Sequence, residues 1–172
     1  MPPPPRYPRR ESVTPSTTPP PGSENWPRPW AQMKYFSFHP AVYPNMIRAV
    51  SPDAGPGDLV HVMDKEGQLF GSGFYNPKAR VPLRVLQHGE DVLTEEKLDA
   101  RLDAALDLRL NTLRLNDSTD AWRAVHSDGD GLSGLVVDRY ADVLSIEVTT
   151  LGIWRRLRRW LPKLHEKLGT TQ

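Results

Sequence analysis

The stretch DLVHVMDKEGQLFGSGFY, residues 58–75, decides the fold of the first part of the chain. Asp58 to Met63 form an apolar, β-branched run that is typical of a strand. Lys65-Glu66-Gly67 predicts a turn, because glycine adopts a positive φ without steric cost. Residues 68–75 return as the partner strand, and the two glycines inside it, Gly71 and Gly73, predict a bulge or a tight bend. Short strands of this kind favour a small barrel or sandwich.

Basic residues lie close to the aromatic pair Phe74-Tyr75, which ends this hairpin. The next strand, 80–86, alternates apolar residues with Arg80 and Arg84, and Lys78 lies in the turn before it. Basic residues beside aromatic ones are what RNA recognition by phosphate contact and base stacking requires. The residues predicted to contact RNA are Arg48, Tyr75, Lys78, Arg80 and Arg84, with Tyr75 as the stacking residue. In the alternative interpretation, Phe74 belongs to the core and the charges are ordinary outward residues of a strand.

A helix and a second β section follow. Thr94 is a good N-cap for a helix whose apolar stripe is Leu98, Leu102, Leu106, Leu110 and Leu113. Three strands are predicted at 122–126, 135–137 and 143–148. The last helix, 151–168, has an apolar face made of Trp154, Leu157, Trp160, Leu161, Leu164 and Leu168. Its basic face holds Arg155, Arg156, Arg158 and Arg159, a possible secondary phosphate site or simply the solvated side of an amphipathic helix.

The N-terminal segment 1–32 contains 11 of the 18 prolines. This composition predicts a disordered tail, or sequence upstream of a functional start at Met33. The formal net charge of the chain is only +1. A nucleic-acid-binding surface must therefore rest on local clusters of cations rather than on total charge.

Several classes of site and location are disfavoured. The chain has no cysteine, which excludes disulfides, thiolate zinc sites and a cysteine nucleophile among these residues. The loop Asp128-Gly129-Asp130-Gly131 lacks the later ligands of a calcium loop, so no metal site and no catalytic residue are predicted. No apolar run is long enough to span a bilayer, and no secretory signal is present, so a cytoplasmic location is expected.

Three sequence blocks carry a resemblance to a known family. They are His39-Pro40-Ala41-Val42-Tyr43 with PGDLVHV (56–62), Gly73-Phe74-Tyr75-Asn76-Pro77, and DGDGLSGLVVDRY (128–140). They resemble the bacterial 23S rRNA (cytosine-C5) methyltransferases that carry an N-terminal PUA domain. Ser133 departs from the pattern, since relatives usually have Pro there. The resemblance implies RNA, specifically 23S rRNA, as the partner. It implies S-adenosylmethionine as the cofactor of the full-length family, with no cofactor in this chain.

The expected architecture is α+β. It comprises a disordered tail (1–32), a PUA-like β-pseudobarrel (33–92), a linking helix (93–117) and a truncated, partial central α/β unit (118–172). The resemblance implies that the methyltransferase domain with its cysteine nucleophile is absent, so the chain alone is not expected to transfer methyl groups. Two alternatives stay open: a subunit that docks onto a separately encoded methyltransferase domain, and a nonfunctional remnant. The sequence does not predict the oligomeric state.

Overall fold

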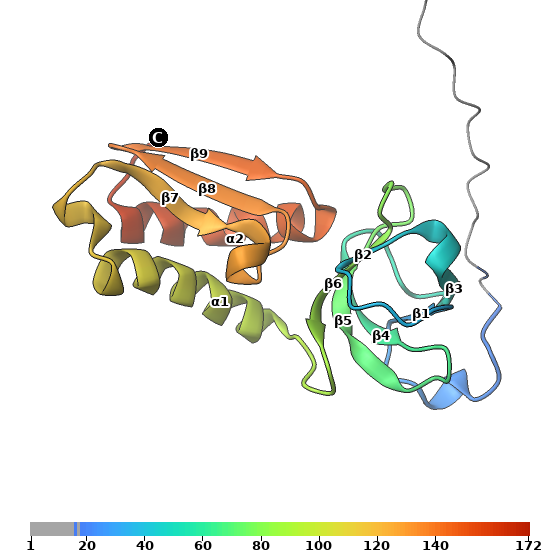
Figure 1. The fold of residues 1–172 in the computed structure, drawn as a ribbon. Coiled ribbons are helices and arrows are strands. Elements are labelled where there is room, and N and C mark those ends of the chain that lie inside the picture. Colours follow the sequence, from blue (N-terminus) through green and yellow to red (C-terminus); the bar gives the residue numbers. More distant parts are fainter. Residues whose placement is uncertain (1–15, 17) are drawn as a thin grey trace, which may run out of the picture.

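The computed structural model describes residue 16 and residues 18–172, and these form two parts that lie side by side (Figure 1). The first part is a six-stranded sheet with the order β2-β6-β5-β4-β1-β3, and this part is called the barrel below. All neighbouring strands in it are antiparallel except β1 and β4, which are parallel. The strands are β1 (Trp30–Met33), β2 (Ala41–Val42), β3 (Ile47–Val50), β4 (Asp58–Met63), β5 (Leu69–Tyr75) and β6 (Leu83–His88), with 3-10 turns at Ser23–Asn25 and Pro44–Met46.

Two glycines let β5 bend tightly against β6. A Cβ on Gly71 would lie 2.1 Å from the carbonyl oxygen of Gln87, and one on Gly73 would lie 2.2 Å from that of Arg84. The register between the two strands shifts between Ser72 and Gly73, as a bulge requires. The predicted bulge is therefore confirmed, and the positive φ of Gly67, 86°, confirms the predicted turn.

The predicted tail is wrong in its last part. β1 lies between β3 and β4, and its Trp30 and Met33 are buried. A start at Met33 would remove most of this strand. The high proline content of residues 1–32 hid the strand sequence Trp30-Ala31-Gln32-Met33, which begins inside this segment and gains enough burial to be ordered. Residues 1–15 and 17, also predicted to be disordered, lie outside the described residues.

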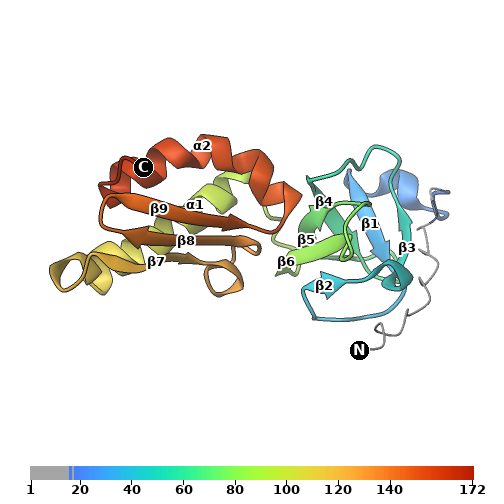
Figure 2. The ribbon, with the colours of Figure 1, turned by 90° about the horizontal axis from the view of Figure 1, so that it is seen from above.

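The second part is a three-stranded antiparallel sheet, β7-β8-β9, with two helices against one face (Figures 1 and 2). Its elements are α1 (Glu95–Asp107), a π-helical turn (Leu108–Thr112), 3-10 turns at Leu115–Asp117 and Ser127–Asp130, β7 (Ala121–His126), β8 (Leu135–Tyr140), β9 (Val143–Val148) and α2 (Leu151–Leu168). The chain is thus α+β. None of the helices in the described part has the length and hydropathy to cross a bilayer.

The helix ends agree with the predicted capping residues, but each predicted apolar face includes one residue that the structure exposes. Thr94 caps α1 by accepting from the Lys97 amide at 3.3 Å. Gly169 ends α2 with a φ of 63°. Leu113, predicted on the apolar stripe, is exposed, because the wider π-helical turn before it changes the angular phase of the helix. Trp154, predicted on the apolar face of α2, is also exposed.

The two parts share one hydrophobic cluster. Phe74 of β5 packs with Leu93, Leu98 and Ile153, together with other core residues of the second part. Gly152 allows the first turn of α2 to approach Phe74, since a Cβ there would lie 2.3 Å from the ring. The helix predicted to be a linker, α1, packs within this same cluster. The second part therefore rests on the barrel through apolar contact as well as through the polypeptide connection.

Candidate functional site

The basic face predicted on α2 is largely neutralised within the molecule. Arg156 Nε donates to Glu95 of α1 at 2.9 Å, and its guanidinium lies 4.6 Å from the centre of the Phe74 ring. Arg155 donates to Asp58 of β4 at 2.8 Å. Arg159 donates to Asp99 at 2.7 Å, and Lys163 pairs with Asp103. Acidic residues of α1 at helical spacing, Glu95, Asp99 and Asp103, thus face the cations of α2.

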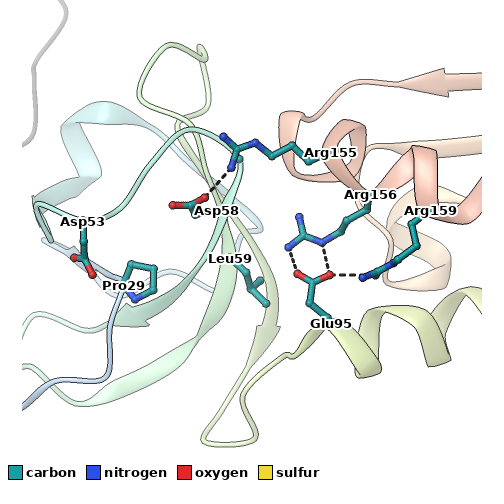
Figure 3. A pocket seen from close by; sticks show the side chains of 9 residues that line it. Pro29, Asp53, Asp58, Leu59, Glu95, Arg155, Arg156 and Arg159 are labelled. Atoms are coloured by element: carbon teal, nitrogen blue, oxygen red, sulfur yellow. Dashed lines mark hydrogen bonds and ion pairs between the residues drawn. The ribbon is translucent and has the colours of Figure 1, made fainter.

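A cavity of about 560 Å³ lies at this junction (Figure 3). Its charged lining residues are Asp53, Asp58, Glu95, Arg155, Arg156 and Arg159, so acids and bases are equal in number. Asp53 also accepts from Arg28 at 2.7 Å, and this hydrogen bond lowers the pKa of the Asp53 carboxyl to about 2. Because its cations already have carboxylate partners, this cavity is a poor phosphate site despite its size.

Arg158 is the exception among the four arginines of this face. It is exposed, and it forms no ion pair with any residue that the structure describes. The prediction of a secondary basic face therefore reduces to one residue. The sequence pattern could not show this, because the acidic partners lie about 60 residues or more away in the chain.

The cations that were predicted to contact RNA in the first part are not neutralised by carboxylates in this way. Arg48, Lys78 and Arg80 are exposed and Arg84 is half-buried, and none of the four pairs with a carboxylate of residues 16 and 18–172. Arg84 Nη1 donates instead to the hydroxyl of Ser133 at 3.1 Å. These side chains therefore keep charge that an anionic partner can use.

A second pocket, of about 230 Å³, gathers part of this group. It lies between the loop before β6 and the start of α2. Its polar and charged lining residues are Tyr75, Asn76, Arg80, Arg84, Thr149 and Thr150, with no carboxylate among them. The structure thus brings together Tyr75, Arg80 and Arg84. Arg48, on β3 at the far end of the sheet order, does not line the pocket, and neither does Lys78.

Tyr75 is not the exposed stacking residue that the sequence suggested. It is 5% exposed and belongs to the core of the barrel, and burial raises the pKa of its hydroxyl. The alternating pattern of β5 hid this, because both Phe74 and Tyr75 are buried: Phe74 faces the second part and Tyr75 faces the barrel interior. A ring enclosed in this way has no face available to a base.

Sequence reasoning missed the aromatic residues that are exposed. Phe36 and Phe38, in the loop after β1, are 59% and 65% exposed. Their rings meet edge to face at 4.8 Å between centroids, and Phe38 also lies 5.3 Å from His88 at the end of β6. We call Phe36, Phe38, Phe70 and His88 the aromatic cluster. The sequence did contain an indication of them: Tyr35-Phe36-Ser37-Phe38-His39 holds three aromatic residues, and the Ser and His among them are unusual for a core strand.

The junction between β9 and α2 does not fit S-adenosylmethionine, the cofactor that the resemblance implies. Nucleotide-binding junctions of α/β proteins follow parallel strands, whereas β9 belongs to an antiparallel sheet. Gly152 leaves no space for an approaching cofactor, because the Phe74 ring already occupies its surroundings. The adjoining pocket is also below the roughly 300 Å³ at which sites for whole drug-sized ligands begin.

Comparison with known proteins defines the first part as a PUA-like domain: residues 28–88 match that family. The match begins at the cis peptide bond Arg28-Pro29 and includes β1, which confirms that the domain starts earlier than residue 33.

Similar whole proteins indicate a narrower class of protein than the domain match does. The chain is 38% identical over 135 residues to a ribosomal RNA large subunit methyltransferase of Deinococcus radiodurans, covering 76% of this chain and 33% of that protein. It is 32% identical over 119 residues to ribosomal RNA large subunit methyltransferase I of Alteromonas mediterranea, covering 66% and 29%. The chain thus spans about a third of the length of these relatives. Together with the PUA-like domain, they support the family that the sequence resembles.

Solved structures agree on the fold alone. A SAM-dependent methyltransferase from Streptococcus mutans superposes with a TM-score of 0.53 at 12% identity, covering 67% of this chain and 30% of the other. A methyltransferase complexed with SAH gives a TM-score of 0.54, also at 12% identity and with the same coverage.

Proposed function

We propose that this chain binds RNA through its PUA-like domain, as the RNA-recognition part of a 23S rRNA (cytosine-C5) methyltransferase. One observation carries the proposal: the PUA-like domain presents Lys78, Arg80 and Arg84 without carboxylate partners, in a chain similar to ribosomal RNA methyltransferases. Cations of this kind release counterions from a phosphate backbone, whereas the paired arginines of α2 have little charge left to offer. The proposal places the chain in the cytoplasm with its RNA.

The two exposed features of the barrel have separate tasks in this proposal. The cations contact phosphates, and Phe36 and Phe38 stack with unpaired bases. β6 connects the two features, with Arg84 near its start and His88 at its end. Four residues of strand separate these positions by about 13 Å, a distance that a short single strand of RNA can follow.

We further propose that these 172 residues do not themselves carry out methyl transfer or bind S-adenosylmethionine. Methylation at cytosine C5 proceeds through attack by an activated nucleophile, and no cysteine is present here to supply the thiolate. The proposed contribution of this chain is therefore to hold the RNA. In this proposal the PUA-like unit contacts the RNA, and the central α/β unit that follows it in the chain supports the PUA-like unit.

A second candidate role is docking onto a separate methyltransferase domain. β9 is an end strand of its sheet, and Trp154 of the adjacent helix is 62% exposed. The outer edge of β9 receives the C-terminal residue only at Leu144, whose amide donates to the Gln172 carbonyl at 2.8 Å. A strand edge that is mostly open among the described residues, and an exposed tryptophan, both suit a protein interface. Mixing the chain with the remaining two thirds of the Deinococcus radiodurans relative tests this role. Docking is supported if the two proteins sediment as one complex and Trp154→Glu abolishes this complex. It is contradicted if the two proteins sediment independently.

The leading proposal is tested by fluorescence anisotropy with single-stranded rRNA fragments at several salt concentrations. The variant Lys78→Ala/Arg80→Ala/Arg84→Ala is compared with Lys65→Ala/Arg114→Ala/Lys167→Ala, which removes the same charge from other exposed positions. We expect the first variant alone to flatten the plot of log K against log salt, by roughly 0.7 per lost contact and thus about 2 in total. Equal slopes for both variants and the wild type would contradict the assignment.

A further inference from the structure

The outer edge of β9 already carries the first hydrogen bonds of a further strand. Gln172 donates its amide to the Asp142 carbonyl at 3.2 Å and accepts from the Leu144 amide at 2.8 Å. These two bonds flank Val143, which is the pattern that one residue of a parallel neighbour makes. Gln172 therefore lies beside β9 and runs in the same direction.

Beyond Leu144 this edge has no neighbour in the described chain. Backbone groups of alternate residues point to the same edge of a strand, so the amides of Ile146 and Val148 point outward, as that of Leu144 does. The Thr149 amide has the opposite phase and donates inward, to the Gly134 carbonyl at 2.9 Å. No described residue outside the sheet accepts from Ile146 or Val148. The edge therefore offers backbone hydrogen bonds to an incoming strand.

The apolar cover above this edge is wider than the sheet. α1 packs against β7 and α2 against β9, so the flank of α2 that is turned away from α1 lies over the outer edge of β9 (Figure 2). Trp154, Leu157 and Leu161 form this flank, on the opposite side of the helix from the residues that pair with the acids of α1. Trp154 is 62% exposed, and the two leucines are half-buried. We call these three residues the α2 flank.

β9 itself is less buried than the strand beside it. Its residues that face the helices, Leu144, Ile146 and Val148, are only half-buried. The corresponding residues of β8, Leu135 and Val137, are fully buried. A fourth strand beside β9 would cover both its half-buried residues and the α2 flank. Such a strand needs apolar residues at every second position, because alternate side chains face the helices.

We propose that the outer edge of β9 binds an extended segment of a separate methyltransferase polypeptide as a fourth strand, parallel to β9. The inference rests on the docking role proposed above and deepens it by naming what docks. The apolar residues of the segment pack against the α2 flank, and its backbone bonds to Ile146 and Val148. A second copy of this chain does not suit the edge. Two β9 edges related by a twofold axis pair antiparallel, contrary to the direction that Gln172 sets.

The test measures hydrogen exchange of the Ile146 and Val148 amides in the whole, ¹⁵N-labelled chain. One probe is the remaining two thirds of the Deinococcus radiodurans relative. The other is a short peptide that alternates threonine and valine between terminal lysines. We expect each probe to slow the exchange of both amides by about tenfold or more, because they become hydrogen-bonded. Trp154→Ala should weaken peptide binding by about tenfold, whereas Tyr140→Ala, at another exposed aromatic residue, should leave it unchanged.

N-methylated peptides test the direction of the strand. The helix-facing residues of β9 point their amides outward, so a parallel neighbour points the amides of its helix-facing valines away from β9. The amides of its threonines then point toward β9. N-methylation of the central threonines should weaken binding by about tenfold or more, and N-methylation of the central valines should not. The reverse result assigns an antiparallel strand and overturns the proposed direction.

Strand addition and the docking role can fail separately. A complex with the larger probe that leaves the exchange of Ile146 and Val148 unchanged overturns strand addition and keeps the docking role. Protection by the peptide without any complex with the larger probe supports strand addition at this edge but refutes the methyltransferase polypeptide as the source of the strand. If neither probe protects these amides, or if self-association of the chain alone protects them, the inference is wrong.

Discussion

Replacing Arg156 with alanine should destabilise the junction of the barrel with the second part. The Arg156 side chain is 10% exposed and makes three kinds of contact. It pairs with Glu95 through two nitrogens, donates to the Gly152 carbonyl at 2.7 Å, and lies over the Phe74 ring at 4.6 Å. Arg156→Ala removes all of these contacts and leaves Glu95 with only Arg159, at 3.1 Å.

The magnitude follows from the exposure of the partners. Removing one member of a fully buried ion pair costs about 3–5 kcal/mol. Glu95 is 42% exposed, so water compensates much of this loss, and we take about 1–1.5 kcal/mol for the pair after that discount. The contact with Phe74, which is largely desolvated, adds about 1–1.5 kcal/mol. The total is about 2–3 kcal/mol, or roughly 4–12 °C in Tm for a chain of this size.

Urea denaturation followed by circular dichroism measures this loss. Arg158→Ala is the matched control, because Arg158 lies on the same helix and has no ion pair in the described structure. Its effect should stay within about 0.5 kcal/mol. A double-mutant cycle with Glu95→Gln isolates the pair from the contact with Phe74. If Arg156→Ala and Arg158→Ala have the same stability, the assignment of Arg156 to the junction is wrong.

Three other predictions concern the barrel. Phe38→Ala should weaken binding of single-stranded RNA by about 5–150-fold, the loss of one stacked base, without moving the urea midpoint; unchanged anisotropy titrations would exclude stacking there. Gly73→Ala should cost about 3 kcal/mol or more, because the new Cβ would lie 2.2 Å from the Arg84 carbonyl oxygen, and a wild-type urea midpoint would disprove the close approach. Burial lowers the pKa of His61 below 6.5, so the unfolded chain takes up the proton first and the free energy of unfolding should decrease as the pH falls through and below 6.5. His61→Gln should reduce this pH dependence in urea titrations at pH 5 and pH 7, and an undiminished dependence would assign it to other groups.

The sequence by itself determined the elements whose signals are local. The strand Asp58–Met63, the helix Leu151–Leu168 and its end at Gly169 agree with the prediction residue by residue. Alternation, capping and glycine conformations depend on neighbours a few positions away, so they can be inferred from a single sequence. The cations of the pocket, Arg80 and Arg84, were also found in this way.

Tertiary structure alone decided which charges are available and which aromatic rings are exposed. Arg156 and Arg80 look equivalent in the sequence, but Arg156 meets Glu95, 61 positions away, while Arg80 meets no described acid. Tyr75 is enclosed and Phe38 is exposed, although Tyr75 ends one apolar strand and Phe38 follows another. Such differences arise when elements distant in the chain pack together. Local periodicity fixes the face on which a side chain lies, and only the packing fixes what that face meets.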